Sequence, residues 1–239
     1  MDDMERYGDY NEIDTPPGKS PVLRVIKIVA VVLIFAIIGF VGFRIFTINY
    51  YPESVKSLYF GDALTDYYNE KNGNITVYTQ KLYAPYDDEK EGNFFCDHLR
   101  FVREAGTLQI TMRYNISLAD DLMMKYGTKV DLENQDVFNF SLWRSGDGAT
   151  VGRLVHAEWD EFLMYRYVKL VFEDVDFSVL DDTDKDNWLS LQITVDGIKE
   201  TDKKTNTQTD KLFRILVYEN QEKYTGFKVY QPSSSEVPK

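Results

Sequence analysis

The chain has 239 residues, with 39 acidic and 27 basic side chains, two histidines, one cysteine and a formal net charge of −12. A single cysteine excludes an intrachain disulfide, and so few cysteines and histidines cannot build a structural zinc site of the usual kind. The acidic charge argues against a nucleic-acid-binding surface, because phosphate contacts need clustered lysine and arginine.

Residues 1–21 are acidic and rich in proline, with Pro16, Pro17 and Pro21, and they contain few aliphatic side chains. Such a segment cannot bury enough apolar surface to offset the entropy of ordering its backbone. The sequence therefore predicts a disordered tail over 1–21.

A long apolar segment follows, with an uncharged run over 28–43. A bilayer core of roughly 30 Å needs about 20 helical residues, and the segment 22–48 supplies them. Arg44-Ile45-Phe46 after the run offers no small-x-small site for signal peptidase, and the run has no polar face that would suit a soluble core helix. We therefore expect one uncleaved, single-pass membrane helix over 22–48.

The basic residues near this helix predict its orientation. Lys19, Arg24 and Lys27 lie on its N-terminal side, against Arg44 and Lys56 on the other side. The positive-inside rule then favours a cytoplasmic N-terminus and an extracytoplasmic C-terminal domain at the cell membrane. A tyrosine-rich domain without disulfide partners would suit the outside of a Gram-positive-type bacterium.

Two short helices are expected in the rest of the chain. In a linker over 49–73, Asp62 could cap a helix over 63–71 that ends at Asn72-Gly73. Ser117 and Asp120 indicate a second capped helix that ends near residue 126.

Strands dominate the segment 74–231. In the first half, the β-branched and aromatic runs 75–83 and 94–103 predict strands separated by a charged loop at 85–93. Residues 108–116 alternate apolar and polar side chains, which indicates a half-buried strand.

The second half continues this pattern. Residues 138–142 alternate, a turn follows at 145–148, and the segment 150–159 is expected to be the hairpin partner of the strand before the turn. A long strand is expected over 165–177 and an alternating one over 189–195. Gly197 then turns the chain into a polar, exposed loop at 199–210. Strands around 213–217 and 227–229 close the set, and 232–239 is expected to be a disordered tail.

These elements predict a mainly β fold of about eight to ten antiparallel strands, each with one solvated face, as in a two-sheet sandwich. The turn spacing suits an immunoglobulin-like or a jelly-roll sandwich. The Cys–Trp–Cys signature of true immunoglobulin domains is absent.

The strongest metal candidate is the acidic run near residue 184. Asp182, Asp184 and Asp186 match alternate positions at the start of a calcium-binding loop. Asn187 replaces the usual glycine, and Ile193 stands where a bidentate glutamate is required. The pattern therefore fails as an EF-hand, and a solvated turn competes with a simpler calcium site.

Catalytic patterns are weak. Glu158, Asp160 and Glu161 flank Trp159, a neighbourhood that would suit a glycan-processing enzyme but that is expected by chance among 39 acids. Cys96 and His98 would share one face of a strand, although a buried, unreactive cysteine explains this pair more simply. We therefore assign no catalytic residue and no cofactor.

Several stretches resemble single-pass membrane proteins of Firmicutes-type bacteria that have no assigned activity. The resemblance rests on Val77-Tyr78-Thr79-Gln80, on Phe94-Phe95 and on 104–115, with the later segments 166–177 and 210–218. It implies an anchored, outward-facing β-sandwich and no catalytic residue.

The functional hypothesis is a binding or structural module at the cell envelope, with protein or glycan partners and no nucleic acid. Its contacts would come from strand edges or from the loops at 85–93, 144–150 and 199–210. The alternatives are an envelope enzyme acting on glycans and a calcium-stabilised adhesion domain.

Overall fold

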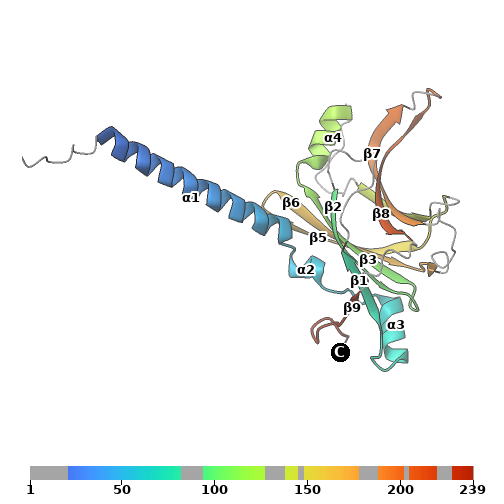
Figure 1. Cartoon of the computed structure of the whole chain (residues 1–239). Helices are drawn as coiled ribbons and strands as arrows, with labels where there is room; N and C mark the ends of the chain where they lie inside the picture. Colours follow the sequence, from blue (N-terminus) through green and yellow to red (C-terminus); the bar gives the residue numbers. More distant parts are fainter. Residues whose placement is uncertain are drawn as a thin grey trace, which may run out of the picture. The chain divides into compact units, whose positions relative to one another are not determined.

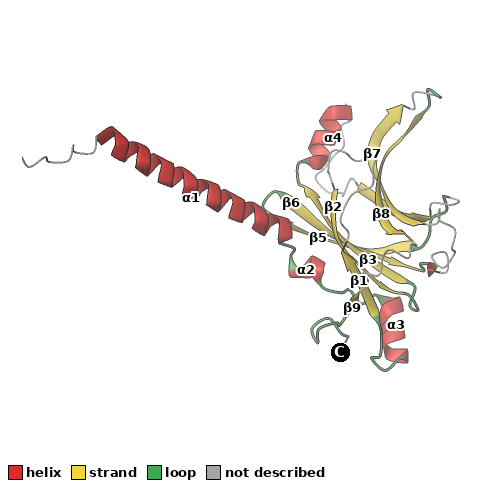
Figure 2. Ribbon diagram, in the orientation of Figure 1, coloured by secondary structure: helices red, strands yellow, loops and turns green. Residues whose placement is uncertain are grey.

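The computed structural model describes residues 21–81, 94–126, 138–144, 148–177, 188–201, 205–219 and 228–238. The chain divides into two compact units, Met1–Tyr50 and Tyr51–Lys239 (Figure 1). The first unit contains the long helix α1, and the second contains the sheets and the short helices (Figure 2).

Helix α1 runs from Pro21 to Asn49, so the helix predicted over 22–48 is confirmed. Proline suits the first turn of a helix, where its missing N–H would have no partner. Within α1, Arg24–Thr47 has a mean hydropathy of 2.9 over its most apolar window. The helix is therefore long and apolar enough to cross a membrane.

The second unit is mainly β, as predicted. Its short helices are α2 (Glu53–Lys56), α3 (Asp62–Glu70) and α4 (Leu118–Tyr126). Its strands are β1 (Val77–Lys81), β2 (Phe94–Val102), β3 (Thr107–Asn115), β4 (Phe138–Arg144), β5 (Arg153–Phe162), β6 (Tyr165–Glu173), β7 (Trp188–Thr201), β8 (Gln208–Glu219) and β9 (Lys228–Tyr230).

The strands form two antiparallel sheets. The six-stranded sheet has the order β5-β6-β3-β2-β1-β9, and the three-stranded sheet has the order β4-β7-β8. The C-terminal strand β9 thus pairs with β1, the first strand of the domain.

One hydrophobic cluster joins the two sheets. The six-stranded sheet contributes side chains such as Ile110 and Leu170, and the three-stranded sheet contributes others such as Leu142 and Ile193, all fully buried. Aromatic contacts cross the same interface, with the rings of Phe94 and Phe138 at 5.3 Å. The alternation read from the sequence therefore identified this core face correctly.

Two expected strand connections are wrong. Segment 150–159 does not form a hairpin with β4, because β5 pairs with β6 in the other sheet and only a single bridge joins Trp143 to Thr150. β4 pairs instead with β7. Gly197 does not turn the chain, since β7 continues through it to Thr201.

The predicted exposed loop at 199–210 is correspondingly too long. Lys199 pairs with Asp210 and Thr201 pairs with Gln208, so both ends of that segment belong to a hairpin. An irregularity in the pairing between Thr194 and Lys199 accommodates the glycine. The polar residues of 199–210 belong to the end of an exposed hairpin, and the sequence analysis interpreted them as a loop.

Helices α3 and α4 confirm the two that were predicted, and α2 adds a third short helix to this unit. The N-cap of α3 is Gly61 and not Asp62, and no side chain caps it. A Cβ at Gly61 would lie 2.6 Å from the side-chain Oε1 of Glu173, the last residue of β6, so a larger residue there would require the Glu173 carboxylate to move.

Strand β3 departs from its expected half-buried pattern. From Thr107 to Tyr114 every residue is buried, including Gln109, Thr111 and Arg113 on the face predicted to be solvated. This second face is covered by chain that lies outside the sheets, and the candidate site lies there.

Candidate functional site

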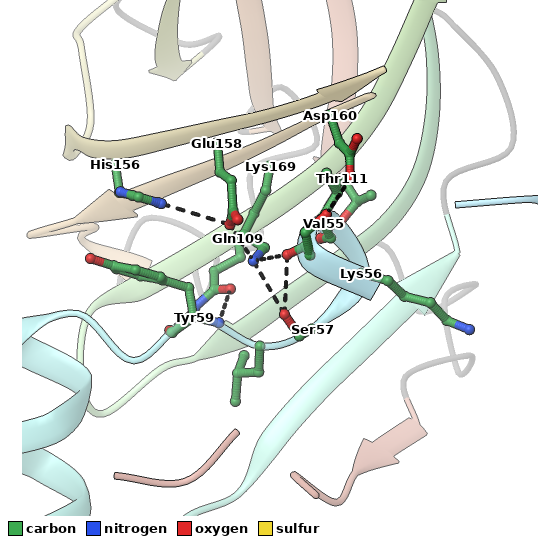
Figure 3. Close-up of polar contacts among 12 residues, drawn as sticks. Val55, Lys56, Ser57, Tyr59, Gln109, Thr111, His156, Glu158, Asp160 and Lys169 are labelled. Carbon is green, nitrogen blue, oxygen red and sulfur yellow. Dashed lines mark hydrogen bonds and ion pairs between the residues drawn. The ribbon is translucent and has the colours of Figure 1, made fainter. Parts of the chain in front are cut away.

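The covering chain is residues 51–60, which we call the strap. It runs from the start of the second unit through α2 and lies against Gln109, Thr111 and Lys169 of the six-stranded sheet (Figure 3). These side chains alternate with the core residues Ile110 and Leu170, so the strap lies on the side of the sheet away from the core. Pro52, Val55 and Leu58 of the strap are buried.

Polar side chains of the sheet bind the main chain of the strap. Gln109 of β3 makes two hydrogen bonds to Tyr59: the Tyr59 N–H donates to Oε1 at 3.0 Å, and Nε2 donates to the Tyr59 carbonyl at 2.6 Å. Arg100 of β2 donates to the carbonyl of Lys56, and Lys169 of β6 donates to the carbonyl of Ser54. The neighbouring strands β6, β3 and β2 therefore each hold a carbonyl of the strap, and the buried side chains of Lys169, Gln109 and Arg100 gain acceptors in this way.

Lys169 is the most buried cation of this face, with its side chain 3% exposed. Its Nζ donates to Glu158 Oε2 at 2.9 Å, and Ser57 Oγ lies 3.4 Å away. The register explains the meeting, since Lys169 stands opposite both Glu158 of β5 and Thr111 of β3. Burial of this charge is tolerable because its donors have acceptors on several sides.

An open pocket of about 800 Å³ lies beside the strap. Strand β5 contributes His156, whose ring stacks on Tyr59 with centroids 4.0 Å apart and an angle of 5° between the planes. His156 Nε2 lies 3.9 Å from Glu158 Oε2. The pocket is lined by Glu53, Ser54, Ser57, Leu58, Tyr59, Phe60, His156, Ala157, Glu158, Trp159, Lys169, Ser235 and Glu236.

The two strap serines lie close to potential proton acceptors, so nucleophilic chemistry must be considered. Ser54 Oγ donates to Asp160 Oδ2 at 2.7 Å. Ser57 Oγ is within reach of Lys169 Nζ, but this ammonium also donates to Glu158 and to the Ser54 carbonyl. A lysine base must offer a lone pair to the hydroxyl. Here Lys169 donates to Ser57 Oγ, so this contact holds the strap and offers the serine hydroxyl no lone pair.

The C-terminal segment closes one side of the pocket. Glu236 accepts hydrogen bonds from the Leu58 N–H, the Tyr230 hydroxyl and Ser233. Arg100 lies 4.2 Å from the centre of the Tyr230 ring. Residues from 232 onward, expected to be a disordered tail, thus include a carboxylate that ties β9 to the strap.

These contacts shift two pKa values. Burial would raise the pKa of Glu236, but hydrogen bonds from Leu58 and Ser233 outweigh burial and hold the pKa below its ordinary value. Burial, with the hydrogen bond to Glu236 and against the opposing charge of Arg100, raises the pKa of Tyr230 to about 12. Glu236 is thus an acceptor at neutral pH and Tyr230 is a donor.

The acids around Trp159 do not converge on its ring. Glu158 and Asp160 lie on the strap face, where they are bonded to Lys169 and Ser54. Trp159 stands opposite Val168 of the core face, and Glu161 on that same face is paired with Arg166 at 2.6 Å. The candidate glycan-processing acids are therefore divided between the two faces of β5.

Cys96 and His98 do not share a regular strand face. The pairing of β2 with β3 is irregular between them, so Cys96 stands opposite Met112 and His98 opposite Thr111. His98 Nδ1 contacts Asp97. Cys96 packs against the core, and burial raises the pKa of its thiol to about 12. The thiol is therefore protonated at neutral pH and a poor nucleophile.

The calcium candidates Asp182, Asp184 and Asp186 lie outside the described residues. In the part of the chain that the structure describes, there is no group of three or more His, Cys, Asp or Glu side chains placed to hold a metal ion.

Sequence analysis missed the residues that build this site. Lys169 lies between Val168 and Leu170, and Gln109 lies between Leu108 and Ile110, so each is a polar residue between apolar neighbours in a strand. A lysine or glutamine there was interpreted as the solvated face of a strand. The sequence feature that could have revealed the site is the apolar residues of the strap, Pro52, Val55 and Leu58. A linker exposed to solvent would not need them, so they indicate that this segment packs against the domain.

Comparisons with protein-family models, with curated proteins and with solved structures found no match to this chain.

Proposed function

We propose that the chain is a single-pass membrane protein whose two-sheet sandwich, of the immunoglobulin-like or jelly-roll kind, serves binding or structural interaction at the cell envelope. The N-terminus is cytoplasmic and the domain after α1 is extracytoplasmic, with protein or glycan partners. The acidic domain makes nucleic acid an unsuitable partner.

The strap is the observation that carries this proposal. Only Tyr50 separates the last residue of α1, Asn49, from the first residue of the strap. The hydrogen bonds from Lys169, Gln109 and Arg100 hold the chain at the point where a membrane anchor would pull on it.

The β7–β8 hairpin supports a role in interaction. Its outer pairs, from Lys199–Asp210 to Thr201–Gln208, continue past the segment of β7 that pairs with β4. Residues 205–208 at its end are exposed. A polar hairpin that extends beyond its own sheet offers backbone and side-chain contacts to a partner.

Protease treatment of intact cells tests the topology. A C-terminal epitope tag on the full chain should be lost on treatment with external protease, while the mass of the untreated membrane-bound chain should show that α1 is retained. A protected tag would overturn the orientation, and a chain shortened by the length of α1 would overturn the anchor.

Site-specific photo-crosslinking tests the interaction. A photoreactive residue at Thr205, in the hairpin end, should give an envelope adduct that is absent from the matched position Glu104, an exposed turn residue between β2 and β3. Equal adducts at both positions, or none at either, would contradict a binding role for the hairpin.

A further inference from the structure

Four exposed apolar side chains gather at one end of the six-stranded sheet. They are Phe95 at the start of β2 (40% exposed), Ile116 after β3 (37%), and Leu163 and Met164 in the β5–β6 turn (51% and 41%). We call this group the apolar tip.

The sheet register brings the tip together. The Ile116 N–H donates to the Met164 carbonyl at 2.9 Å. Phe95 stands opposite Arg113 in the β2–β3 pairing. The Arg113 guanidinium lies 5.3 Å from the centre of the Phe95 ring and 4.7 Å from that of Tyr165, the residue after the turn. The four side chains therefore lie near one another, at the same end of the sheet.

Leu163 is held in an unusual conformation. Its φ is +57°, in the left-handed region that glycine and asparagine adopt at lower cost. For a bulky residue this conformation costs on the order of 1 kcal/mol or more. Full burial of the side chain within the domain does not offset this cost, because Leu163 is 51% exposed.

The chain enters the domain at this same end. The ring of Tyr51, the first residue of the strap, lies 5.1 Å from that of Tyr167, and its hydroxyl donates to the carbonyl of Phe95 at 3.4 Å. Arg113 also lies over the Tyr51 ring, at 5.6 Å. Tyr51 is thus fixed beside the tip.

Chain length then limits how far the tip can lie from a membrane. Tyr51 follows the last helical residue, Asn49, by two positions, and two extended residues span at most about 7 Å. If α1 crosses the bilayer, Tyr51 lies at the bilayer surface, where tyrosine side chains are favoured.

We propose that the apolar tip inserts into the interfacial layer of the bilayer that α1 spans, on the side of the folded domain. This inference rests on the proposed membrane anchor. Residues 49–239 carry 33 acidic and 22 basic side chains, so attraction to anionic lipid does not drive the contact. Near the tip, the Glu161 carboxylate is neutralised by Arg166. The driving force is burial of apolar surface, and the lipid that fits is zwitterionic.

Spin labels on the full chain in phosphatidylcholine nanodiscs test the proposal. The background is Cys96→Ala, so that one engineered cysteine carries the label. Leu163→Cys and Met164→Cys report the tip, Glu104→Cys reports the opposite end of the β2–β3 pair, and Ile34→Cys reports the middle of α1. Collisions with oxygen, which concentrates in lipid, are compared with collisions with a water-soluble nickel complex. Each labelled variant must melt at the temperature of the Cys96→Ala parent.

The expected result is a several-fold higher ratio of oxygen to nickel collisions at 163 and 164 than at 104, with the highest ratio at 34. A water-like ratio at both tip positions, with a lipid-like ratio at 34, would overturn the tip contact and leave the anchor intact. Protection from both reagents at the tip would indicate a protein occupant, such as a second copy, and would also overturn it. A water-like ratio at 34 would show that the anchor itself fails.

Discussion

Lys169 Nζ and Glu158 Oε2 lie 2.9 Å apart across β5 and β6, but the two side chains differ greatly in burial, at 3% and 35% exposed. Glu158 can be rehydrated from the open pocket, whereas Lys169 is enclosed between the sheet and the strap. The pair is therefore asymmetric, and its two halves should respond differently to substitution.

Replacing the buried member of the pair, Lys169, should lower the free energy of unfolding more than replacing Glu158. Lys169→Met keeps an unbranched side chain one atom shorter but removes the donors to the Ser54 carbonyl, Ser57 and Glu158, so we expect a loss of about 3 kcal/mol in the free energy of unfolding. Glu158→Gln leaves an acceptor beside Lys169 but removes its negative charge, so we expect a smaller loss of about 1–2 kcal/mol. Urea unfolding of the full chain in detergent, followed by tryptophan fluorescence, measures both. Equal losses would contradict the asymmetry.

The strap should loosen when its partner in β3 is removed. Gln109→Leu deletes both hydrogen bonds to Tyr59, and we expect a loss of about 1–3 kcal/mol with faster hydrogen exchange in the strap. Gln192→Leu is the matched control, because Gln192 is a buried strand glutamine of the three-stranded sheet. Faster exchange of the strap in the control, or unchanged exchange in Gln109→Leu, would argue against the clamp.

Sequence pattern revealed the strands but not what covers them. The alternation of 108–116 located β3 and its core face correctly, because cores need apolar side chains at every second position. It could not show that Gln109 and Arg113 are buried. The alternating sequence pattern is the same whether the polar face of a strand contacts solvent or is covered by another segment of the chain. Burial of the second face depends on residues about 50 positions earlier, and local periodicity does not report such contacts.

The pairing of the strands could not be predicted from local sequence signals either. The turn signal after β4 was genuine: the Arg144 N–H donates to the Ala149 carbonyl, and the Val151 N–H donates to that of Leu142. After this turn the chain enters the six-stranded sheet, where β5 pairs with β6. Gly197 was interpreted as a stop, although a glycine inside a strand also fits a bulge.

Acid should weaken the attachment of the C-terminal segment. The pKa of Glu236 is lower in the folded chain than in the unfolded chain, so its contribution to stability is present above the unfolded pKa and is lost as the pH falls through the folded pKa. Glu236→Gln should therefore flatten the decline of stability over this acidic range. Glu104→Gln is the control at an exposed turn. Parallel pH profiles for the wild type and Glu236→Gln would contradict the assignment.

Cys96 should be inert in the folded chain. Burial raises the pKa of its thiol from 9.0 to about 12, and only the thiolate attacks disulfide reagents. At pH 8 the thiolate fraction is then about a thousandfold smaller than in the unfolded chain. The rate of reaction with an aromatic disulfide, measured with and without urea, should differ by at least that factor. Comparable rates would show that the thiol is not enclosed by the core.

Two glycines with similar backbone angles should separate conformational strain from steric clash. Gly148 and Gly152 have φ values of +68° and +82°. A Cβ at Gly148 would meet only the Trp143 ring, at 3.8 Å, so Gly148→Ala should cost about 1 kcal/mol from the backbone alone. A Cβ at Gly152 would lie 2.7 Å from Val175 Cγ2 and 3.0 Å from the Glu173 carbonyl oxygen, and we expect Gly152→Ala to cost about 2–4 kcal/mol. Urea unfolding of both variants measures the difference, and equal costs would mean that the segment around Val175 moves to accept the methyl group.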